Sequence, residues 1–452
     1  MNAVEAAGPE PAADDAPDPY VPGAGDRGFR VTRYELDLDY RVASNRLAGH
    51  ARMIAVAARD LPAFTLDLSG LRAVKVTVDS HRPRRQRQRP GKLSVQLNRA
   101  IPAGQPFEIE VEYQGSPRPI RGRWGEVGWE ELSDGVIVAG QPEGAPTWFP
   151  CNDRPDDKAS YRISVTTESP YTVVANGTLV DRRVHSSRTT WVYEQPQPMA
   201  SYLATVQIGR YTVGESDSQP VRQLLATTAR LRRAAQHDFA RQTKMIVAFQ
   251  DMFGPYPFDS YTVVVTDDEL EIPLEAQSLS IFGSNHVDGQ RGSERLIAHE
   301  LAHQWFGNSL TLGRWRDVWL HEGFACYAEW LWSERSGGHE ASTLARREWQ
   351  RLQHLPQDFV LANPGPDRMF DDRLYKRGAL TLHALRQVLG DRAFFSMLSA
   401  WVLTHRYSTV TTGAFVQHAT AASSAPNRDR VATLLGSWLQ RPALPDLPVR
   451  AG

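Results

Sequence analysis

Two histidines and a glutamate in the second half of the chain have the spacing of a metal-binding helix. His299 and His303 lie four residues apart, so on a helix both imidazoles project from one face toward a common point. Zinc binds such nitrogen ligands, and Glu300 is offset so that its carboxylate can reach a water molecule on the metal. The alternative is a surface helix with two solvated histidines, but the neighbouring Leu296 and Ile297 make the segment largely apolar. We therefore expect a zinc site here.

A third ligand candidate, Glu322, lies nineteen positions beyond His303. It belongs to a second predicted helix, capped by Asp317 and running to Gly337, and a neighbouring antiparallel helix could bring its carboxylate to the same metal. Two histidines and one carboxylate leave the fourth position of a tetrahedral zinc ion open for water, as in catalytic rather than structural sites. Taken alone, Glu322 could also be an acidic residue that the helix dipole favours in a first turn.

In these residues the sequence resembles the aminopeptidase N family of zinc metallopeptidases, a gluzincin family. The family signature is His-Glu-x-x-His, then eighteen residues and a glutamate, which both histidines, Glu300 and Glu322 match. The run Gln-Trp-Phe-Gly-Asn at residues 304–308 matches as well. The resemblance implies one Zn2+ per chain and a general-base role for Glu300. His321 departs from the asparagine usual before the third ligand, and we interpret it as a packing or supporting residue.

The resemblance also implies residues that bind the free amine of a peptide substrate. Glu275 corresponds to the glutamate of the family's Gly-x-Met-Glu-Asn loop, although the glycine and asparagine of that loop are absent. Glu143, with Gln141 as the weaker candidate, resembles a second amine contact before the family's Phe-Pro-Cys-x-Asp motif, here residues 149–153. One charge-assisted contact of this kind contributes about 1.5–3 kcal/mol. A surface-loop acid is the alternative for Glu275.

Tyr375 is the candidate for stabilising the oxyanion of the reaction, because its segment is similar to the family's Tyr-x-Lys-Gly. Arg377 stands at the position of the usual lysine. A phenol can donate a hydrogen bond to a negative oxygen without titrating near neutral pH. The alternative is a core tyrosine at the start of an amphipathic helix.

The elements that must position these residues differ along the chain. Apolar residues alternate with acids at residues 34–40 and again at 107–113, the period of a strand with one buried face, whereas helical spacing prevails later. We expect an α+β, multidomain protein with a disordered acidic tail at 1–27, an N-terminal β-sandwich or saddle domain at 28–212 and a catalytic domain at 213–452. The resemblance implies a saddle-like antiparallel β-domain followed by a thermolysin-like, mainly helical catalytic domain.

Composition is typical of a globular protein, with 41% hydrophobic and 23% charged residues. Lys and Arg total 51 against 52 Asp and Glu, so no global field attracts nucleic acid or anionic lipid, and no stretch approaches the ~20 apolar residues that cross a bilayer. The only cysteines, Cys151 and Cys326, fit a reducing compartment, so we expect a cytoplasmic protein without nucleic-acid or membrane partners. We interpret the basic run at residues 82–89 as a solvated hairpin loop rather than a site for an acidic partner.

Together these features predict a zinc aminopeptidase that acts on peptides with a free N-terminus. Many relatives add a large C-terminal helical domain, for which 452 residues leave no room, so we expect a short bacterial-type form with a more open cleft between its domains. Two alternatives remain: a thermolysin-like endopeptidase, indifferent to a free amine, and a catalytically retired scaffold that acts as a binding module. The intact ligand set argues against the scaffold, which has no need for an open metal position.

Overall fold

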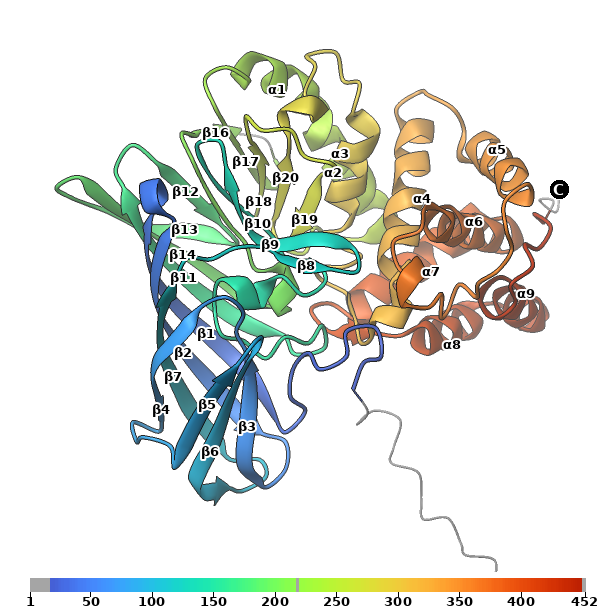
Figure 1. Ribbon diagram of the computed structural model, residues 1–452. Helices are drawn as coiled ribbons and strands as arrows, with labels where there is room; N and C mark the ends of the chain where they lie inside the picture. The colour runs from blue at the N-terminus through green and yellow to red at the C-terminus, as the bar shows by residue number, and fades with distance from the viewer. Residues whose placement is uncertain (1–16, 217–218, 449–452) are drawn as a thin grey trace, which may run out of the picture.

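The computed structural model describes residues 17–216 and 219–448, which form a β-rich N-terminal part and a mainly helical C-terminal part (Figure 1). The predicted α+β architecture is confirmed. The largest sheet consists, in spatial order, of β13 (Thr178–His185), β14 (Arg188–Met199), β11 (Ala159–Glu168), β1 (Phe29–Arg41), β2 (Arg46–Ala57), β7 (Pro106–Gly115) and β4 (Arg72–Val78). Neighbouring strands are antiparallel except β1 and β11, so the expected antiparallel sheet contains one parallel pair.

β1 and β7 carry the alternation predicted from the sequence. The apolar residues at alternate positions of 34–40 and 107–113 are buried, and the acids between them are partly or fully exposed. Each strand therefore buries one face, and these faces form the core together with two smaller sheets. One of these contains β12 (Thr172–Ala175), β15 (Val206–Gly209), β10 (Gly135–Ala139), β9 (Gly125–Leu132) and β8 (Ile120–Gly122), and the other contains β3 (Leu61–Asp67), β6 (Lys92–Ile101) and β5 (Arg85–Arg89).

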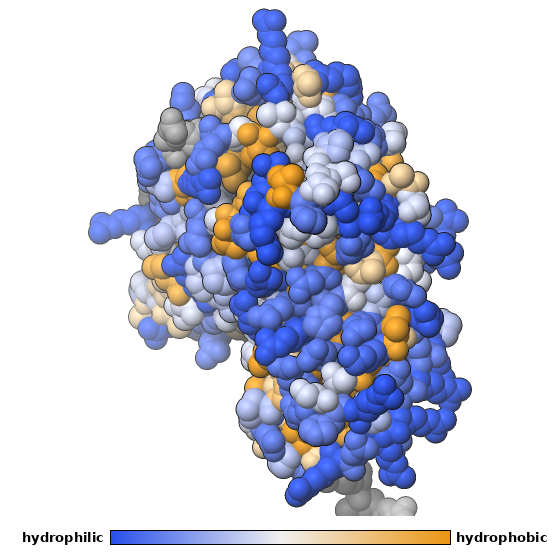
Figure 2. All heavy atoms as spheres, turned by 90° about the vertical axis from the view of Figure 1, so that its left-hand side faces the viewer, coloured by the Kyte–Doolittle hydropathy of each residue, from blue (hydrophilic) through white to orange (hydrophobic). Residues whose placement is uncertain are grey.

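The basic run at residues 82–89 is more than the hairpin loop we expected. Residues 85–89 form β5, an edge strand that pairs with β6 and is exposed along its whole length. Arginine and glutamine alternate in it without an apolar face, so no hydrophobic period marks the strand. Charged edge strands resist pairing with other chains. Figure 2 views the molecule from the left-hand side of Figure 1, and hydrophilic residues cover most of this face, with apolar residues scattered among them.

The predicted acidic tail is partly ordered. Residues 1–16 lie outside the described residues, but residues 17–27 are ordered, and the prediction of disorder is wrong for them. Tyr20 is buried, and its hydroxyl donates to Asn363 Oδ1 (2.7 Å) and accepts from the backbone N–H of Gly365 (2.8 Å). Because these partners lie more than 340 positions away, the local composition gave no sign of them.

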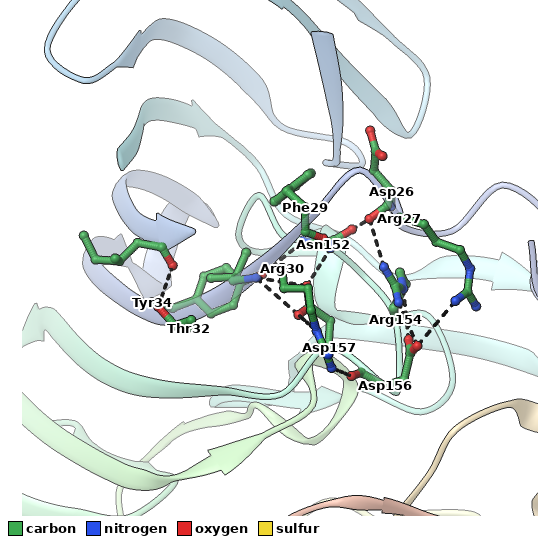
Figure 3. Close-up of polar contacts among 12 residues, drawn as sticks. Asp26, Arg27, Phe29, Arg30, Thr32, Tyr34, Asn152, Arg154, Asp156 and Asp157 are labelled. Carbon is green, nitrogen blue, oxygen red and sulfur yellow. Dashed lines mark hydrogen bonds and ion pairs between the residues drawn. The ribbon is translucent and has the colours of Figure 1, made fainter. Parts of the chain in front are cut away.

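Asn152 connects the start of β1 to the loop that precedes β11 (Figure 3). Its side-chain oxygen accepts from Asp26 N–H (2.6 Å), its side-chain amide donates to Asp157 Oδ2 (2.6 Å), and its backbone N–H donates to the Tyr34 hydroxyl (3.0 Å). The preceding Cys151 is buried, and burial raises the pKa of its thiol well above the usual value. These residues therefore fasten the β-domain, and the thiol packs rather than reacts.

The C-terminal part combines a five-stranded mixed sheet with a group of helices that lies on the right in Figure 1. In spatial order the sheet consists of β16 (Thr212–Ser216), β17 (Arg222–Thr227), β18 (Ser260–Val265), β20 (Leu279–Phe282) and β19 (Leu274–Ala276). The helices are α1 (Arg232–Asp238), α2 (Gln242–Phe253), α3 (Glu294–Ala302), α4 (Trp319–Arg335), α5 (Ala341–Gln353), α6 (Asp372–Leu389), α7 (Asp391–Thr404), α8 (Thr412–Ala422) and α9 (Arg428–Gln440), and β21 (Thr311–Leu312) pairs with β22 (Thr409–Val410). We propose a domain boundary near residue 212, because β15 belongs to a sheet of the N-terminal part and β16 to this one. None of the helices in the described part of the chain has both the length and the apolar character needed to cross a membrane.

Two glycines allow α4 and α6 to cross with their backbones in contact. A Cβ atom added to Gly323 would lie 2.8 Å from the Cα of Gly378, and one added to Gly378 would lie 2.6 Å from the Cα of Gly323. Only glycine fits on either side of such a contact. Gly323 follows Glu322 directly, and Gly378 lies three residues after Tyr375. The crossing therefore sets the positions of two predicted site residues relative to each other.

Candidate active site

α3 carries the two histidines predicted to bind a metal. Its apolar residues Ile297 and Leu301 are fully buried in the core. The helix ends at Ala302, and His303 follows with φ −57° and ψ −23°, so it keeps helical geometry. The ring centroids of His299 and His303 lie 4.8 Å apart. The two imidazoles therefore share one buried face, as their spacing predicts.

α4 brings Glu322 to the same point. The predicted N-cap is wrong, because α4 begins at Trp319 and Asp317 lies in a 3₁₀ turn before it. Glu322 lies in the first turn, and its Oε2 is 3.4 Å from His299 Nε2 and 3.5 Å from His303 Nε2. Ligand atoms at about 2.0–2.2 Å from a tetrahedral zinc ion lie about 3.3–3.6 Å from one another. The three donor atoms therefore fit one zinc ion.

Carboxylates surround the two imidazoles and raise the pKa of both. Burial alone would lower the pKa of His299, but hydrogen bonds to Glu322 and Glu329 raise it to about 10. Burial also opposes the change at His303, where the charges of Glu322 and Glu275 raise the pKa to about 9. Burial would raise the pKa of Glu322 itself, but the two histidines hold it well below its usual range. The donor set thus attracts positive charge, and a dication would displace the protons from the imidazoles.

Glu300 lies beside the three donors without a partner for one of its oxygens. The residue is 4% exposed, and its Oε2 makes no hydrogen bond within the described part of the chain. Burial raises the pKa of Glu300 to about 7, because the charges of both histidines only partly offset the loss of solvation. A buried carboxylate oxygen without a partner is destabilising in itself, and it is free to accept a proton from water.

Tyr375 and Glu275 approach the donors from two other elements. Tyr375, in the first turn of α6, stacks on the His299 ring with centroids 6.2 Å apart and 17° between the planes. Burial and the nearby carboxylates raise the pKa of Tyr375 well above its usual value, so its hydroxyl keeps its proton. Glu275 lies on β19, and one oxygen each of Glu275 and Glu300 and a ring nitrogen of His303 lie within 4.8 Å of one another. A hydrogen-bond donor and a carboxylate therefore flank the metal donors.

Glu143 and Gln141 lie in the loop after β10, in the N-terminal part, and both are half-buried. Burial and the charge of Asp67 raise the pKa of Glu143. The side-chain nitrogen of Gln141 is buried and has no hydrogen-bond partner among the described residues. No hydrogen bond or ion pair joins either side chain to the metal donors within residues 17–216 and 219–448. Their relation to the site depends on how this loop is held.

Tyr202 connects that loop to the site, and no motif in the sequence pointed to it. Its backbone packs against Gly140, where an added Cβ would lie 2.1 Å from the Tyr202 carbonyl oxygen. Its hydroxyl donates to the carbonyl oxygen of Gly307, 3.5 Å away, in the loop that follows α3. Burial, together with the charges of Glu275 and Glu322, raises its pKa well above the usual value. The loop after β10 is therefore fastened to a residue that lies beside the metal donors.

Comparison with known proteins agrees with this geometry. A model of the peptidase M1 N-terminal domain matches residues 31–203, and a model of the peptidase family M1 domain matches residues 237–438. A crystal structure of a two-domain M1 zinc metallopeptidase variant bound to L-tryptophan covers 95% of this chain and 99% of that one, at a TM-score of 0.87 and 30% sequence identity. The chain belongs to peptidase family M1. The family resemblance predicted from the sequence is therefore confirmed.

Other relatives of this M1 peptidase include a chain of similar length and much longer proteins. The M1 zinc metallopeptidase from Deinococcus radiodurans, solved as a variant with a Tyr-Ser-Ala substrate, is 28% identical at a TM-score of 0.88, with 96% of this chain and 99% of that chain covered. Aminopeptidase M1 of Arabidopsis thaliana is 27% identical over 343 residues, which are 70% of this chain but 38% of that protein. The chain spans about half or less of the length of the curated relatives it matches.

Glu329 supports the first histidine of this M1 site and was missed from the sequence. His299 Nδ1 lies 2.8 Å from Glu329 Oε1, and Arg295 pairs with the same carboxylate at 2.9 Å. Glu329 follows Glu322 by seven residues, or two helical turns, so both carboxylates project from one face of α4. That spacing was a usable signal. A carboxylate on Nδ1 fixes the tautomer in which Nε2 is free to bind metal.

His303, His321 and Arg377 use nitrogen atoms for structural contacts. His303 Nδ1 lies 3.0 Å from the carbonyl oxygen of Phe306, which again leaves Nε2 for the metal. His321 Nε2 accepts a hydrogen bond from the backbone N–H of Leu312 (3.0 Å). Burial lowers the pKa of His321 to about 3, so the ring is neutral and its Nε2 is already engaged in this bond. Arg377 donates to a backbone carbonyl oxygen near the end of α9. These contacts favour the supporting role that we predicted for His321.

Replacing Glu329 with glutamine should weaken zinc binding by about 10–100-fold, the usual effect of removing a carboxylate behind a metal-binding histidine. Glutamine can still accept the hydrogen bond from His299, so the fold should persist while the supporting charge is lost. Competition with a chelator measures the affinity. Glu348→Gln, at the surface of α5, removes the same charge and should leave the affinity unchanged. Equal zinc affinity in the Glu329→Gln and wild-type proteins would show that Glu329 does not support the site.

Proposed function

We propose that this M1 peptidase is a zinc-dependent aminopeptidase that hydrolyses N-terminal residues from peptides. The observation that carries the proposal is the meeting of three donor atoms, from His299, His303 and Glu322, beside the unpartnered carboxylate oxygen of Glu300. Relatives named aminopeptidases and a neighbour solved with a tripeptide substrate support this activity. One Zn2+ per chain is the proposed cofactor, and peptides with a free N-terminus are the proposed substrates.

The surrounding side chains divide the proton transfers and charge stabilisation among them. A bound zinc ion would act as a Lewis acid on the scissile carbonyl and on water. Glu300 accepts a proton from the attacking water and later delivers it to the leaving amine; its pKa, which burial raises to about 7, suits transfer in both directions. Tyr375 donates a hydrogen bond to the carbonyl oxygen as that oxygen becomes negative, since its own proton is retained.

Glu275 and Glu143 hold the ammonium group of the substrate in this proposal. Support for Glu275 comes from its position, since its carboxylate lies within 4.8 Å of a Glu300 oxygen and a His303 nitrogen. An ammonium bound there would belong to the same residue as the reacting carbonyl, as an aminopeptidase requires. Glu143 would supply a second charge from the N-terminal part, and Gln141 is the weaker candidate for that contact. We also propose cytoplasmic residence, supported by two buried free thiols, Cys151 and Cys326.

A free tripeptide amide and its N-acetylated form test the proposal directly. The zinc-loaded protein should cleave the free form, and this activity should disappear on treatment with a chelator. Acetylation should lower kcat/KM by about 10–150-fold for each charge-assisted contact that the ammonium loses, because one such contact contributes about 1.5–3 kcal/mol. Glu275→Gln should reduce the rate for the free form and leave the acetylated form unaffected. Equal cleavage of both forms by the wild-type protein would instead indicate an endopeptidase.

A further inference from the structure

The hairpin of β8 and β9 crosses from the N-terminal part to the catalytic part (Figure 1). At its tip, Trp124 Nε1 donates to the carbonyl oxygen of Pro366 (2.9 Å), and its ring meets the Phe370 ring edge to face, with centroids 6.0 Å apart and 85° between the planes. Arg123 pairs with Asp367 at 3.1 Å, but both side chains are well exposed, so this pair adds little. The indole therefore provides the main connection. We call residues 122–125 and 366–370 together the arch.

The two ends of the arch stand beside two site residues. At the hairpin end, a Cβ added to Gly122 would lie 3.0 Å from Glu143 Oε1, so the tip packs directly on the proposed amine-binding carboxylate. At the other end, Phe370 lies two residues before the start of α6, whose first turn carries Tyr375. The arch thus runs from the residue proposed to hold the substrate's ammonium to the helix that carries the proposed oxyanion donor.

We propose that the arch closes the cleft beyond the ammonium of the substrate, so that a peptide residue before the cleaved one has no place to lie. This inference rests on the proposed aminopeptidase function and extends it: the arch, with Trp124 as its specificity-determining residue, restricts the enzyme to the first peptide bond. Charge recognition alone separates free from blocked peptides by about 10–150-fold for each contact that the blocked peptide loses, since one contact contributes about 1.5–3 kcal/mol. A closed end excludes an additional residue, which needs about 3.3–3.6 Å of extended chain plus its side chain.

The connections of the arch favour a fixed wall over a mobile lid. Trp124 is partly buried and packs against the hydrophobic core of the molecule. Tyr20 fastens the same catalytic segment from the N-terminal part through Asn363 and Gly365. A hydrogen-bonded indole, an aromatic edge contact worth about 0.5–1.5 kcal/mol and a second fastening therefore hold the two parts together here.

Opening the arch tests the inference. Two variants open the arch: the double variant Arg123→Ala/Trp124→Ala and the single variant Phe370→Ala. In each, cleavage after the tyrosine of an acetyl-Gly-Tyr-Ser-Ala amide should rise about tenfold or more relative to cleavage of a free Tyr-Ser-Ala amide. This is the size of effect expected when a steric block is removed. Mass spectrometry of the first product identifies the bond cut. Arg121→Ala is the matched control, because Arg121 lies on the same hairpin, its side chain is 84% exposed and it forms an ion pair with Glu126 on the neighbouring strand. The cleavage ratio of this variant should equal that of the wild type.

A binding measurement separates the failure of this inference from the failure of the proposed function. In a Glu300→Gln background, the labelled extended peptide should bind about tenfold more tightly once Trp124 is replaced by alanine, whether or not any variant turns over. If the zinc-loaded wild type does not cleave the free tripeptide amide, the proposed function fails. If it does, and neither the cleavage ratio nor the affinity for the extended peptide changes in either opened variant, the arch does not close the cleft.

Discussion

Replacing Glu300 with glutamine should lower kcat for a free tripeptide amide by about 10²–10⁴-fold, the range that a general base contributes, and zinc should remain bound. Glutamine keeps the size of the side chain but cannot accept the proton of water. The metal donors His299, His303 and Glu322 are unchanged, so the metal content should stay at one zinc per chain. Steady-state kinetics at saturating substrate and elemental analysis of the same sample measure the two quantities.

Stability provides an independent check on the Glu300→Gln protein. Glu300 Oε2 is buried without a partner among the described residues, and burial raises the pKa of the group, so the native fold does not depend on its charge. The free energy of unfolding should therefore be unchanged or higher in the variant. Glu271→Gln, at an exposed acid in the loop before β19, should leave kcat at the wild-type value. A folded, zinc-loaded Glu300→Gln protein with turnover close to that of the wild type would disprove the general-base role.

The metal donors could be predicted because their geometry is local to two helices. Four-residue spacing fixes the relation of His299 to His303, and a match to the family signature points to Glu322. Tyr202 gave no such signal, since its contact with Gly307 joins residues 105 positions apart and depends on how the two parts pack. Glu329 lies between these cases: its seven-residue spacing from Glu322 was visible, but its partner His299 could be assigned only once the packing of α3 on α4 was known.

The same distinction applies to the fold. Strands with one buried face, such as β1 and β7, carry a hydrophobic period and could be predicted. The fully exposed β5 carries none, and the ordered segment at residues 17–27 is held by distant partners. The arch belongs to this second group, because Trp124 and Pro366 meet across 242 positions. Sequence patterns therefore pointed to the three proposed metal donors, whereas the arch depends on contacts between the two parts.

Replacing Glu322 with glutamine should abolish both zinc binding and activity, the largest loss that we expect from one substitution. Glu322 is the only anionic member of the three-donor set, and its Oε2 lies 3.4 and 3.5 Å from the two histidine nitrogens. An amide keeps the shape but lacks the charge that attracts the dication. At a zinc concentration 100-fold above its Kd, the wild-type protein should gain about 2.7 kcal/mol in unfolding free energy, and the variant should gain none.

Denaturant unfolding with and without zinc measures this gain, and activity need not be detectable for the comparison. Glu329→Gln is the informative control, because it removes a buried carboxylate from the same face of α4 and leaves all three donors in place. It should still be stabilised by zinc at a higher concentration, since its affinity falls by only about 10–100-fold. Because burial would raise the pKa of Glu322 and the histidines hold it down, the charge is present at neutral pH and its loss is what the variant tests. A Glu322→Gln protein that binds stoichiometric zinc with wild-type affinity would remove α4 from the metal site and, with it, the proposed aminopeptidase.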